Sequence, residues 1–308
     1  MRVLVTGSTG FIGSALVPLL LRQGYRVRCA TRRPAALPMG AEPAVVGDVA
    51  QRPDWRPALE GVGAIVHLAG LAHQRGAVVA DAHAAITIDG TVSLAEAAAN
   101  AGVERLVFLS SIAVNGESSG ERPLREEDAP RPNGAYARCK WEAERRLIAI
   151  ASRHAMAWCI VRPPLVYGAG APGNFRRLQR AVARGWPLPL GAAAAKRSFI
   201  AIDNLNAVLL SALAAPQARN GLFLASDGED VSTAEFVTTL ARHMGVNLRL
   251  LPVPPLLLKA AAALTGRAAD VNKLFEPLQL DISRLRQCLG WRPVVTLDEG
   301  LRRAIAKP

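Results

Sequence analysis

The stretch VTGSTGFIG, residues 5–13, decides the fold because it sets three glycines between the pattern of a strand and that of a helix. The run RVLVTG is typical of a β-strand, and FIGSALVPLLLRQGY carries apolar residues at helical spacing. Glycine here permits a tight turn, lets the backbone approach a pyrophosphate and lets the helix pack close to the strand. The context predicts a dinucleotide-binding turn rather than a turn of purely structural origin.

The helix after these glycines supplies the second half of the expected phosphate site. Its first turn offers free backbone amides and the positive end of the helix dipole. We therefore expect the phosphates to bind along the backbone of this turn. The candidate ligands are Gly7, Gly10, Phe11, Ile12 and Gly13.

Outward from this turn, the first half of the chain alternates β-branched runs with helical patterns, which is the signature of βαβ units and a parallel sheet. Further strands are predicted in RVRCATR, AEPAVVGDV, GAIVHLAG, VERLVFLSS and MAWCIVRPP, and helices in HAAITIDGTVSLAEAAANAG and NGAYARCKWEAERRLIAIASRH. The predicted fold class is α/β, a doubly wound parallel sheet of the Rossmann type with a smaller C-terminal α/β substrate domain.

The regular alternation ends near residue 165, where proline and glycine become frequent. We predict a dinucleotide-binding domain over 1–165 and a mainly substrate-binding domain over 166–308. The later region is too long to be a linker. Residues near 198–226 again read as strand, helix and strand, and are expected to rejoin the first sheet.

Composition narrows the class of protein. The 308 residues are 50% hydrophobic, enough for a packed core, and this excludes a disordered chain. The net charge of +12 suggests attraction to nucleotides, polyanions or acidic lipid without choosing among them. Four scattered cysteines without a CxxC pair indicate neither a zinc site nor a disulfide framework, so we expect a reducing cytoplasm and, since the five histidines lack ligand spacing, no metal.

No membrane-spanning segment is predicted. The N-terminus lacks the pattern of a signal peptide. The longest apolar stretch, LLPVPPLLLKAAAALTG, is broken by three prolines and Lys259 and is shorter than the roughly 20 residues that a span needs. It reads as a buried or surface helix, with membrane contact as a minor alternative.

The end of the second predicted strand bears on the choice of dinucleotide. NAD enzymes usually carry an acid there, whereas a basic residue suits the 2′-phosphate of NADP. This chain has Arg32 and Arg33 in CATRRP, which favours NADP, with NAD possible and two solvated arginines as the alternative. Asp48 and Val49 could lie against the adenine, although a helix cap is an equally ordinary role for Asp48.

Three residues form a candidate catalytic group. Tyr136 and Lys140 stand four apart in YARCK on a predicted helix, so they share one face. A tyrosine with a pKa of about 10 is a poor acid–base group at neutral pH, and a neighbouring ammonium is expected to lower that pKa. Ser111, at the end of the fifth strand, can place a hydroxyl beside the same substrate oxygen.

These motifs occur in a familiar order: TGSTGFIG, GDV, HLAG, FLSSIAVNGE, YARCK, RPPLVYG, GNF, PLPLG, RSFIAIDNL, SDGEDVS and LGWRP. Over essentially its whole length the chain resembles the extended short-chain dehydrogenase/reductase family, in its nucleotide-sugar epimerase, dehydratase and 4-ketoreductase branch. The run SSIAVNGE to PLPLG looks similar to bacterial O-antigen enzymes of the UDP-N-acetylquinovosamine 4-dehydrogenase type, many of which are also called UDP-glucose 4-epimerases.

The resemblance implies a role for each candidate residue. Tyr136 would be the acid–base, Lys140 its partner and a ribose ligand, and Ser111 the oxyanion partner. Leu68, Ala69 and Gly70 would line the cofactor cleft, and Pro163 and Val166 would pass near the nicotinamide. Asn174, Arg197 and Lys273 would contact the substrate diphosphate, with Arg197 the best suited because a guanidinium binds phosphate in a bidentate manner.

Three positions depart from the family pattern. Thr87 replaces the asparagine of NVxGT, Cys139 replaces the serine of YxxSK, and Asn115 stands where VYG has tyrosine. They bear on the proton relay and on the identity of the substrate.

The resemblance implies hydride transfer at C4 of a UDP-sugar in surface polysaccharide synthesis, and a homodimer; Arg32 and Arg33 favour NADP(H) as the hydride carrier. Reduction of a UDP-4-keto-6-deoxy-N-acetylhexosamine is the leading hypothesis, and a UDP-glucose or UDP-N-acetylglucosamine 4-epimerase is the alternative. A non-catalytic NADP-sensing or RNA-binding module would suit the charge, but it has no need of an acid–base pair, so no nucleic-acid partner is expected.

Overall fold

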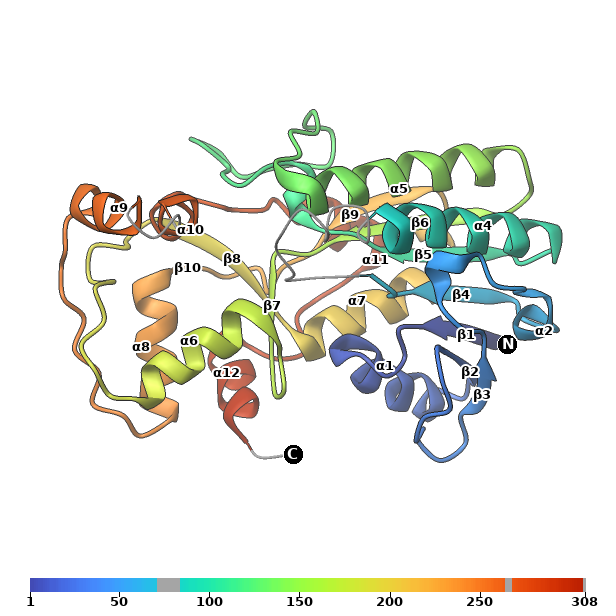
Figure 1. Ribbon diagram of the computed structural model, residues 1–308, viewed down its shortest axis with the longest axis horizontal. Helices are drawn as coiled ribbons and strands as arrows, with labels where there is room; N and C mark the ends of the chain where they lie inside the picture. Colours follow the sequence, from blue (N-terminus) through green and yellow to red (C-terminus); the bar gives the residue numbers. More distant parts are fainter. Residues whose placement is uncertain (71–83, 264–267, 307–308) are drawn as a thin grey trace.

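Seven parallel strands form the larger of two sheets, in the order β3-β2-β1-β4-β5-β6-β9 (Figure 1). The computed structural model describes residues 1–70, 84–263 and 268–306. The strands are β1 (Arg2–Thr6), β2 (Arg26–Thr31), β3 (Glu42–Val45), β4 (Ala64–His67), β5 (Arg105–Leu109), β6 (Ala157–Arg162) and β9 (Gly221–Leu224). The doubly wound fold is confirmed. Its strand order reverses between β1 and β4, and ligands of such sheets bind at the carboxyl ends of the strands beside that point.

Alternate residues of each strand face opposite sides of the sheet. Val3 and Val5 of β1 pack into a core with α1 and α7, whereas Leu4 packs into a second core with α4 and α5. Figure 1 shows α4 and α5 above the sheet and α1 and α7 below it. The covering helices are α1 (Phe11–Arg22), α7 (Ile202–Ala214) and α11 (Ser283–Leu289) on the first side, and α2 (Arg56–Leu59), α4 (Gly90–Asn100) and α5 (Gly134–Ser152) on the second.

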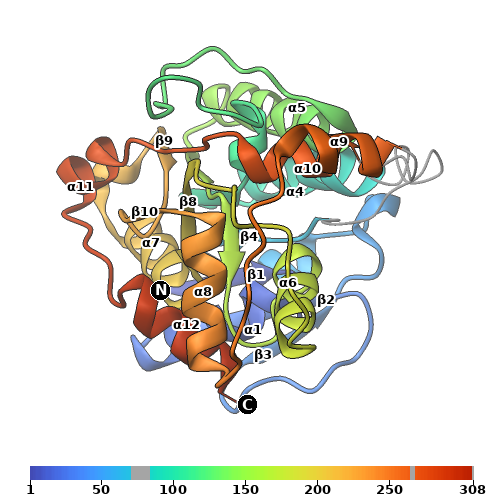
Figure 2. The same ribbon diagram turned by 90° about the vertical axis from the view of Figure 1, so that its left-hand side faces the viewer.

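A smaller sheet of order β10-β8-β7 forms the centre of what we call the small lobe. Its strands are β7 (Leu165–Tyr167), β8 (Lys196–Ala201) and β10 (Asp230–Ser232). Around a third core lie α6 (Gly173–Ala183), α8 (Thr233–His243) and α12 (Leu297–Ile305), seen together in Figure 2. The lobe also carries α9 (Pro255–Ala263) and α10 (Ala268–Phe275).

The segment 198–226 divides between the two sheets. Helix α7 packs into the core of the large sheet and β9 is its edge strand. Strand β8, in contrast, pairs with β7 of the small sheet, with Leu165 opposite Phe199. The expected strand over 197–201 is therefore present, but in the smaller sheet. The domain division at residue 165 stays a prediction.

A buried polar group fixes the small lobe to the C-terminal segment. The Asp227 carboxylate accepts hydrogen bonds from Tyr167 Oη (2.7 Å) and Asn204 Nδ2 (2.7 Å), and Asn204 Oδ1 accepts from the amides of Val294 and Val295. Burial raises the pKa of Asp227 to about 6. Since each polar atom has a partner, the group can be buried without a large desolvation penalty.

The long helix expected over 83–102 is not regular. A π-helical turn, Ala84–Asp89, precedes α4. Such turns are uncommon and are frequently found at functional sites. His73 and His83, among the histidines read as unsuited to a metal site, lie outside the described residues.

Candidate active site

Ser111, Tyr136 and Lys140 come together at the carboxyl end of β5. Ser111 follows that strand and accepts a hydrogen bond from the amide of Ala113 (3.3 Å), which fixes its side chain. Tyr136 and Lys140 lie one turn apart on α5, and the Tyr136 hydroxyl is hydrogen-bonded to Ser111. The structure thus groups the three residues that the sequence singled out.

Two residues of β5 contact the Lys140 side chain. The side chain is only 5% exposed, its Nζ donates to the Leu109 carbonyl (2.9 Å), and the ammonium lies 4.6 Å from the centroid of the Phe108 ring. Burial lowers its pKa to about 8, against the opposing effect of Glu144. A Cβ on Gly70 would lie 3.3 Å from Nζ, so glycine leaves this ammonium its space.

The expected lowering of the Tyr136 pKa is not found. Burial raises the pKa of this phenol, and the hydrogen bond with Ser111 lowers it in part. The Lys140 ammonium donates a hydrogen bond to the Leu109 carbonyl. The tyrosine is therefore set to hold its proton at neutral pH and to act as a proton donor.

The sequence did not reveal a chain of buried hydrogen bonds beside this group. Thr6 Oγ1 accepts from the amides of Leu68 and Ala69 (both 3.2 Å), so its proton is directed to His67 Nδ1 at 2.6 Å. His67 Nε2 is 3.0 Å from Thr91 Oγ1. Burial lowers the pKa of His67 to about 3, so the ring is neutral and places no positive charge beside Lys140.

These contacts also bear on Leu68, Ala69 and Gly70, whose expected place in a cofactor cleft stays a prediction. Thr6 fixes the backbone of the first two at the end of β4, and Gly70 lies against Lys140. The backbone after β4 is thereby brought to the catalytic group. Leu68 and Ala69 are held here by their main-chain amides. A sequence motif can suggest such main-chain contacts but does not show them.

A second group that the sequence did not reveal is a buried ion pair behind α5. Arg162 Nε and Nη2 donate to the two oxygens of Glu144 (2.9 and 2.5 Å), and Arg162 Nη1 donates to Asn115 Oδ1 (2.8 Å). Asn115, the departure from VYG, is thus buried and bound to Arg162. This arrangement ties β6 to the helix that carries Tyr136 and Lys140.

The other two departures are also buried. Burial raises the pKa of the Cys139 thiol, which keeps it protonated and unreactive. Thr87 is fully buried in the π-helical turn, and its Oγ1 has no hydrogen-bond partner among the described residues. Its backbone carbonyl accepts from Thr91 Oγ1 (2.5 Å).

The glycine turn has the geometry of a phosphate cradle. A Cβ on Gly13 would lie 2.2 Å from the Gly7 carbonyl oxygen, so no larger residue fits there. Gly10 is the N-cap of α1 and provides no side-chain cap, which leaves the first amides of the helix free for an anion. Phe11 and Ile12 supply such amides, while their side chains pack against the third and first cores, respectively. These residues fit a dinucleotide pyrophosphate.

Arg32 and Arg33 directly follow β2, and both are exposed. Within the described parts of the chain, neither forms an ion pair or a side-chain hydrogen bond, so both guanidinium groups are available. Asp48 accepts a hydrogen bond from the amide of Ala50 (3.0 Å) and so acts as a cap, one of its two expected roles. Val49 packs beside Gly90, and the adenine contact of both residues stays a prediction.

The remaining candidates are more scattered. The Pro163 carbonyl accepts from the Ile112 amide (2.9 Å), next to Ser111, and Val166 packs on the first core. Asn174 is exposed in the first turn of α6. Arg197 Nη1 donates to the Glu276 carbonyl (2.6 Å), and burial lowers its pKa.

Lys273 is engaged by a carboxylate. Its Nζ lies 2.8 Å from Glu117, on the loop that follows Ser111. Arg197 and Lys273 both border the segment that leads from α10 to residue 278. The contacts of the described residues do not join Asn174 to this pair, so the predicted diphosphate site is assembled only in part.

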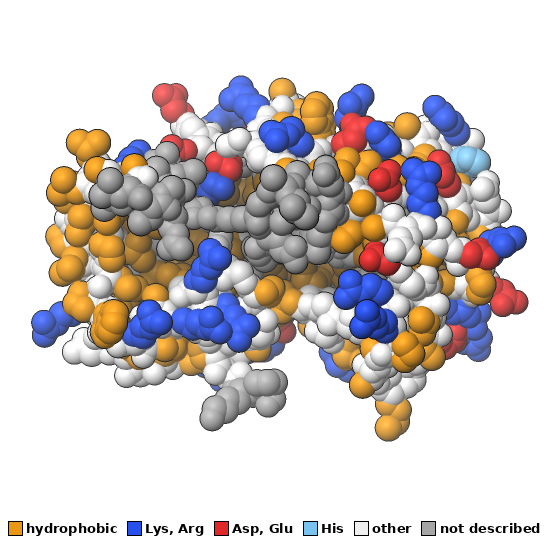
Figure 3. Space-filling model, in the orientation of Figure 1, with side chains coloured by type: hydrophobic (Ala, Val, Ile, Leu, Met, Phe, Trp, Pro, Cys, Tyr) orange, Lys and Arg blue, Asp and Glu red, His pale blue; other side chains and the backbone are white. Residues whose placement is uncertain are grey.

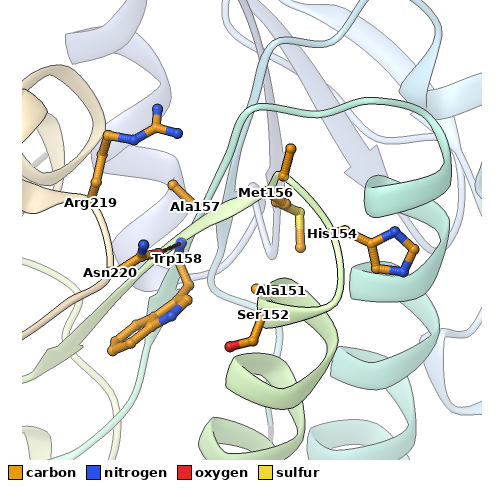
Figure 4. Close-up of a pocket in the computed structure, with 9 residues that line it drawn as sticks. Ala151, Ser152, His154, Met156, Ala157, Trp158, Arg219 and Asn220 are labelled. Carbon is orange, nitrogen blue, oxygen red and sulfur yellow. Dashed lines mark hydrogen bonds between the residues drawn. The ribbon is translucent and has the colours of Figure 1, made fainter.

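A pocket of about 400 Å³ lies at the opposite edge of the sheet, where β6 and β9 begin (Figure 4). Its lining includes His154, Trp158, Arg219 and Asn220. Ligands of doubly wound sheets bind at the carboxyl ends of the strands, so this amino-terminal pocket is separate from the catalytic group. Among the described residues there is no group of three or more side chains suited to a metal, and no helix long and apolar enough to cross a membrane.

The fold and the catalytic group define a dinucleotide-binding enzyme with a tyrosine–lysine pair. Residues 3–223 match the NAD dependent epimerase/dehydratase family, and the chain belongs to that family. An enzyme is thereby favoured over the sensing or RNA-binding module.

Relatives support this assignment. A "UDP-glucose 4-epimerase" of Vibrio cholerae is 39% identical over 306 residues, covering 97% of this chain and 93% of the relative. The structure of the Thermus thermophilus UDP-glucose 4-epimerase in complex with NAD is 26% identical, with a TM-score of 0.80 and coverage of 99% and 97%. The structure of MoeE5 with UDP-glucuronic acid and NAD is 27% identical, with a TM-score of 0.81 and coverage of 99% and 98%.

Proposed function

We propose that this enzyme transfers a hydride at C4 of a UDP-sugar and acts mainly as a reductase of a UDP-4-keto-6-deoxy-N-acetylhexosamine. The observation that carries the chemistry is the hydrogen-bonded pair of Ser111 and Tyr136 above a buried Lys140. UDP-sugars in solved relatives, such as the UDP-glucuronic acid of MoeE5, support the substrate class.

The chain's own residues provide binding and proton transfer. The turn Gly7 to Gly13 and the amides of α1 would hold the pyrophosphate of the dinucleotide, which supplies the hydride when bound. Tyr136 donates its phenolic proton to the C4 oxygen as the carbonyl becomes a hydroxyl. Ser111 donates a hydrogen bond to the same oxygen and stabilises its developing negative charge.

Lys140 serves this step through charge and position. Its ammonium, bonded to Leu109, is expected to reach the ribose of the cofactor and to favour the phenolate that remains after proton transfer. Leu68, Ala69 and Gly70 would carry the cofactor past this point, with Pro163 and Val166 near the nicotinamide. On the substrate side we assign Arg197 to the diphosphate, with Asn174 and Lys273 as further contacts.

The proposed cofactor is NADP, with NAD as the alternative. Arg32 and Arg33 are exposed, form no ion pair with described residues and directly follow β2, where a basic residue suits the 2′-phosphate of NADP. A charge-assisted contact of this kind contributes roughly 1.5 to 3 kcal/mol. Calorimetric titration should show tighter binding of NADP, and exchange of both arginines for serine should remove the difference. Equal affinity of the unchanged chain for both dinucleotides would contradict the proposal.

A UDP-glucose 4-epimerase is the second candidate, and the Vibrio cholerae relative favours it. Such an enzyme would oxidise C4, let the keto sugar turn, and return the hydride to its other face with no net use of cofactor. Because an epimerase would keep its cofactor bound, it would not need Arg32 and Arg33 to select NADPH from solution.

One assay separates the two candidates. The enzyme is given the UDP-4-keto sugar and NADPH deuterated at its transferable position, and the NADPH absorbance and product mass are followed. Stoichiometric loss of NADPH with one deuterium at C4 supports the reductase. Interconversion of UDP-glucose and UDP-galactose without added cofactor and without absorbance change identifies the epimerase.

We also propose a role in O-antigen synthesis, a cytoplasmic location and a homodimer. The location is supported by four cysteines that are all free thiols, three of them buried. Sedimentation of the purified chain tests the dimer, because a monomer at micromolar concentration contradicts it.

A further inference from the structure

Large hydrophobic side chains are exposed along one edge of the small lobe. We call Trp186, Leu251, Leu256 and Leu257 the apolar edge; they are 67%, 46%, 77% and 61% exposed. Single exposed hydrophobic residues are normal, whereas several together mark an interaction surface. We therefore infer that the apolar edge is an interaction surface.

Two separate segments form this edge and are bonded together. The amides of Leu188 and Leu251 donate to the carbonyls of Arg249 (2.9 Å) and Leu188 (2.8 Å), so residues 186–191 run beside 249–251. Trp186 stands at the start of the first segment, and the second leads directly into α9. Trp186 and Leu251 thus belong to the same edge as the leucines of α9.

The exposed face of α9 is apolar, which is the reverse of a normal surface helix. Leu256, Ala260 and Ala263 are exposed at spacings of four and three residues, and Leu257 lies beside them. A surface helix of a globular protein normally turns charged and polar residues to water. Helix α9 instead presents hydrocarbon there, with Lys259 half-buried at the flank.

Positive charge accompanies the apolar edge in the two chain segments that carry it. Segments 173–191 and 246–263 contain six basic residues and no aspartate or glutamate. Arg176, Arg177, Arg180 and Arg184, which we call the basic row, are exposed and form no ion pair with described residues. Figure 3 shows hydrophobic side chains gathered at the left-hand end, over α9 and the chain before it, with basic side chains below over α6. The Arg184 guanidinium lies 5.7 Å from the Trp186 ring centroid, which joins the two features.

We propose that the apolar edge and the basic row dock the enzyme on an anionic lipid bilayer. Exposed leucine and tryptophan enter the interface, while arginine and lysine reach the headgroup phosphates. Either signal alone gives weak binding, and the two together give a stable peripheral contact. A second copy of the chain is a poor occupant, because a two-fold contact would set the same cations against each other. Docking is independent of the sugar that the active site accepts.

Vesicle flotation of the full-length protein tests the proposal. Vesicles of phosphatidylcholine with about 30% phosphatidylglycerol are expected to bind the protein at least about tenfold more strongly than phosphatidylcholine alone, and salt should weaken the binding. Leu256→Asp/Leu257→Asp and, separately, Arg180→Glu/Arg184→Glu should each lower partition by about tenfold or more.

The matched control is Met39→Asp/Val294→Asp, which adds the same charge at two hydrophobic residues exposed outside the edge. This control should keep most of the binding, and circular dichroism and turnover of soluble substrate establish that each variant is folded. Absence of binding to anionic vesicles, or equal losses in edge and control variants, overturns the proposal. Conversion of a dimer to a monomer by Leu256→Asp/Leu257→Asp also overturns it, because the edge would then be an interface between copies.

Discussion

Removal of the carboxylate of Glu144 should be among the most damaging single changes behind the active site. Glu144 and Arg162 have side chains that are 3% and 4% exposed, and two hydrogen bonds of 2.9 and 2.5 Å join them. Loss of one partner from a buried ion pair costs about 3 to 5 kcal/mol, because the other charge stays buried without compensation. Glu144→Gln keeps the shape and one acceptor, so we expect about 3 kcal/mol, or roughly 6 °C in Tm at about 2 °C per kcal/mol for a chain of this size.

The same helix supplies the control. Glu142 lies two residues earlier and pairs with Arg145 and Arg146, whose side chains are 64% and 49% exposed. Exposed pairs contribute about 0 to 1 kcal/mol, so Glu142→Gln should be close to neutral. Urea unfolding followed by tryptophan fluorescence measures both variants. Equal midpoints for the two variants would refute the reasoning that burial makes the Glu144 pair important.

Three further outcomes follow from the site. Thr91→Val removes the partner of His67 Nε2 and should lower the free energy of unfolding by about 1 to 3 kcal/mol. Thr87→Val deletes a hydroxyl that has no partner among the described residues and should be neutral or stabilising; urea midpoints measure both variants. Because burial places the pKa of Lys140 near 8, below its usual value, the ammonium is lost as the pH rises through 8, and turnover should decline above that pH; a flat profile to pH 10 would argue against the assignment. Tyr136→Phe should remove most turnover while cofactor affinity, measured by calorimetry, stays nearly unchanged. Ser111→Ala should cost less, about 10² to 10³ in turnover.

The sequence predicts the parts of this molecule whose physical causes are local. Gly13 is required by the contact with the Gly7 carbonyl six residues earlier, and Tyr136 and Lys140 share a face through helical spacing. The parallel sheet is predicted by the alternation of strand-like and helix-like segments, because each strand is a short apolar, β-branched run. Such features need no knowledge of which distant residues meet.

The parts that the sequence could not predict depend on distant contacts. In the sequence, His67 looks like an ordinary histidine. Only the contact of β1, β4 and α4 makes it a neutral ring with a hydrogen bond at each nitrogen. The sequence also predicts a lowered pKa for Tyr136, whereas burial of the phenol in the folded protein raises it. Helical spacing places Lys140 nearby, but the free carbonyl of Leu109 at the end of β5 holds its ammonium. The threonines at 6, 87 and 91 are visible in the sequence, but only the fold shows that Thr6 and Thr91 contact His67.

The fold shows where the excess of positive charge lies and which of the arginines are open to ligands. The sequence carries a net +12 without a location. In the structure, Arg162 is neutralised inside the protein, and Arg105 Nη1 donates to the carbonyls of Ala212, Leu213 and Ala215 at the end of α7, so neither can attract a ligand from solution. Arg32 and Arg33 remain at the carboxyl edge of the large sheet, and the basic row remains on the small lobe. Because one group follows β2 and the other lies on α6 beside Trp186, the two proposals assign the positive charge to two separate kinds of recognition, of a cofactor phosphate and of lipid headgroups. Neutralising one group should therefore leave the function of the other intact.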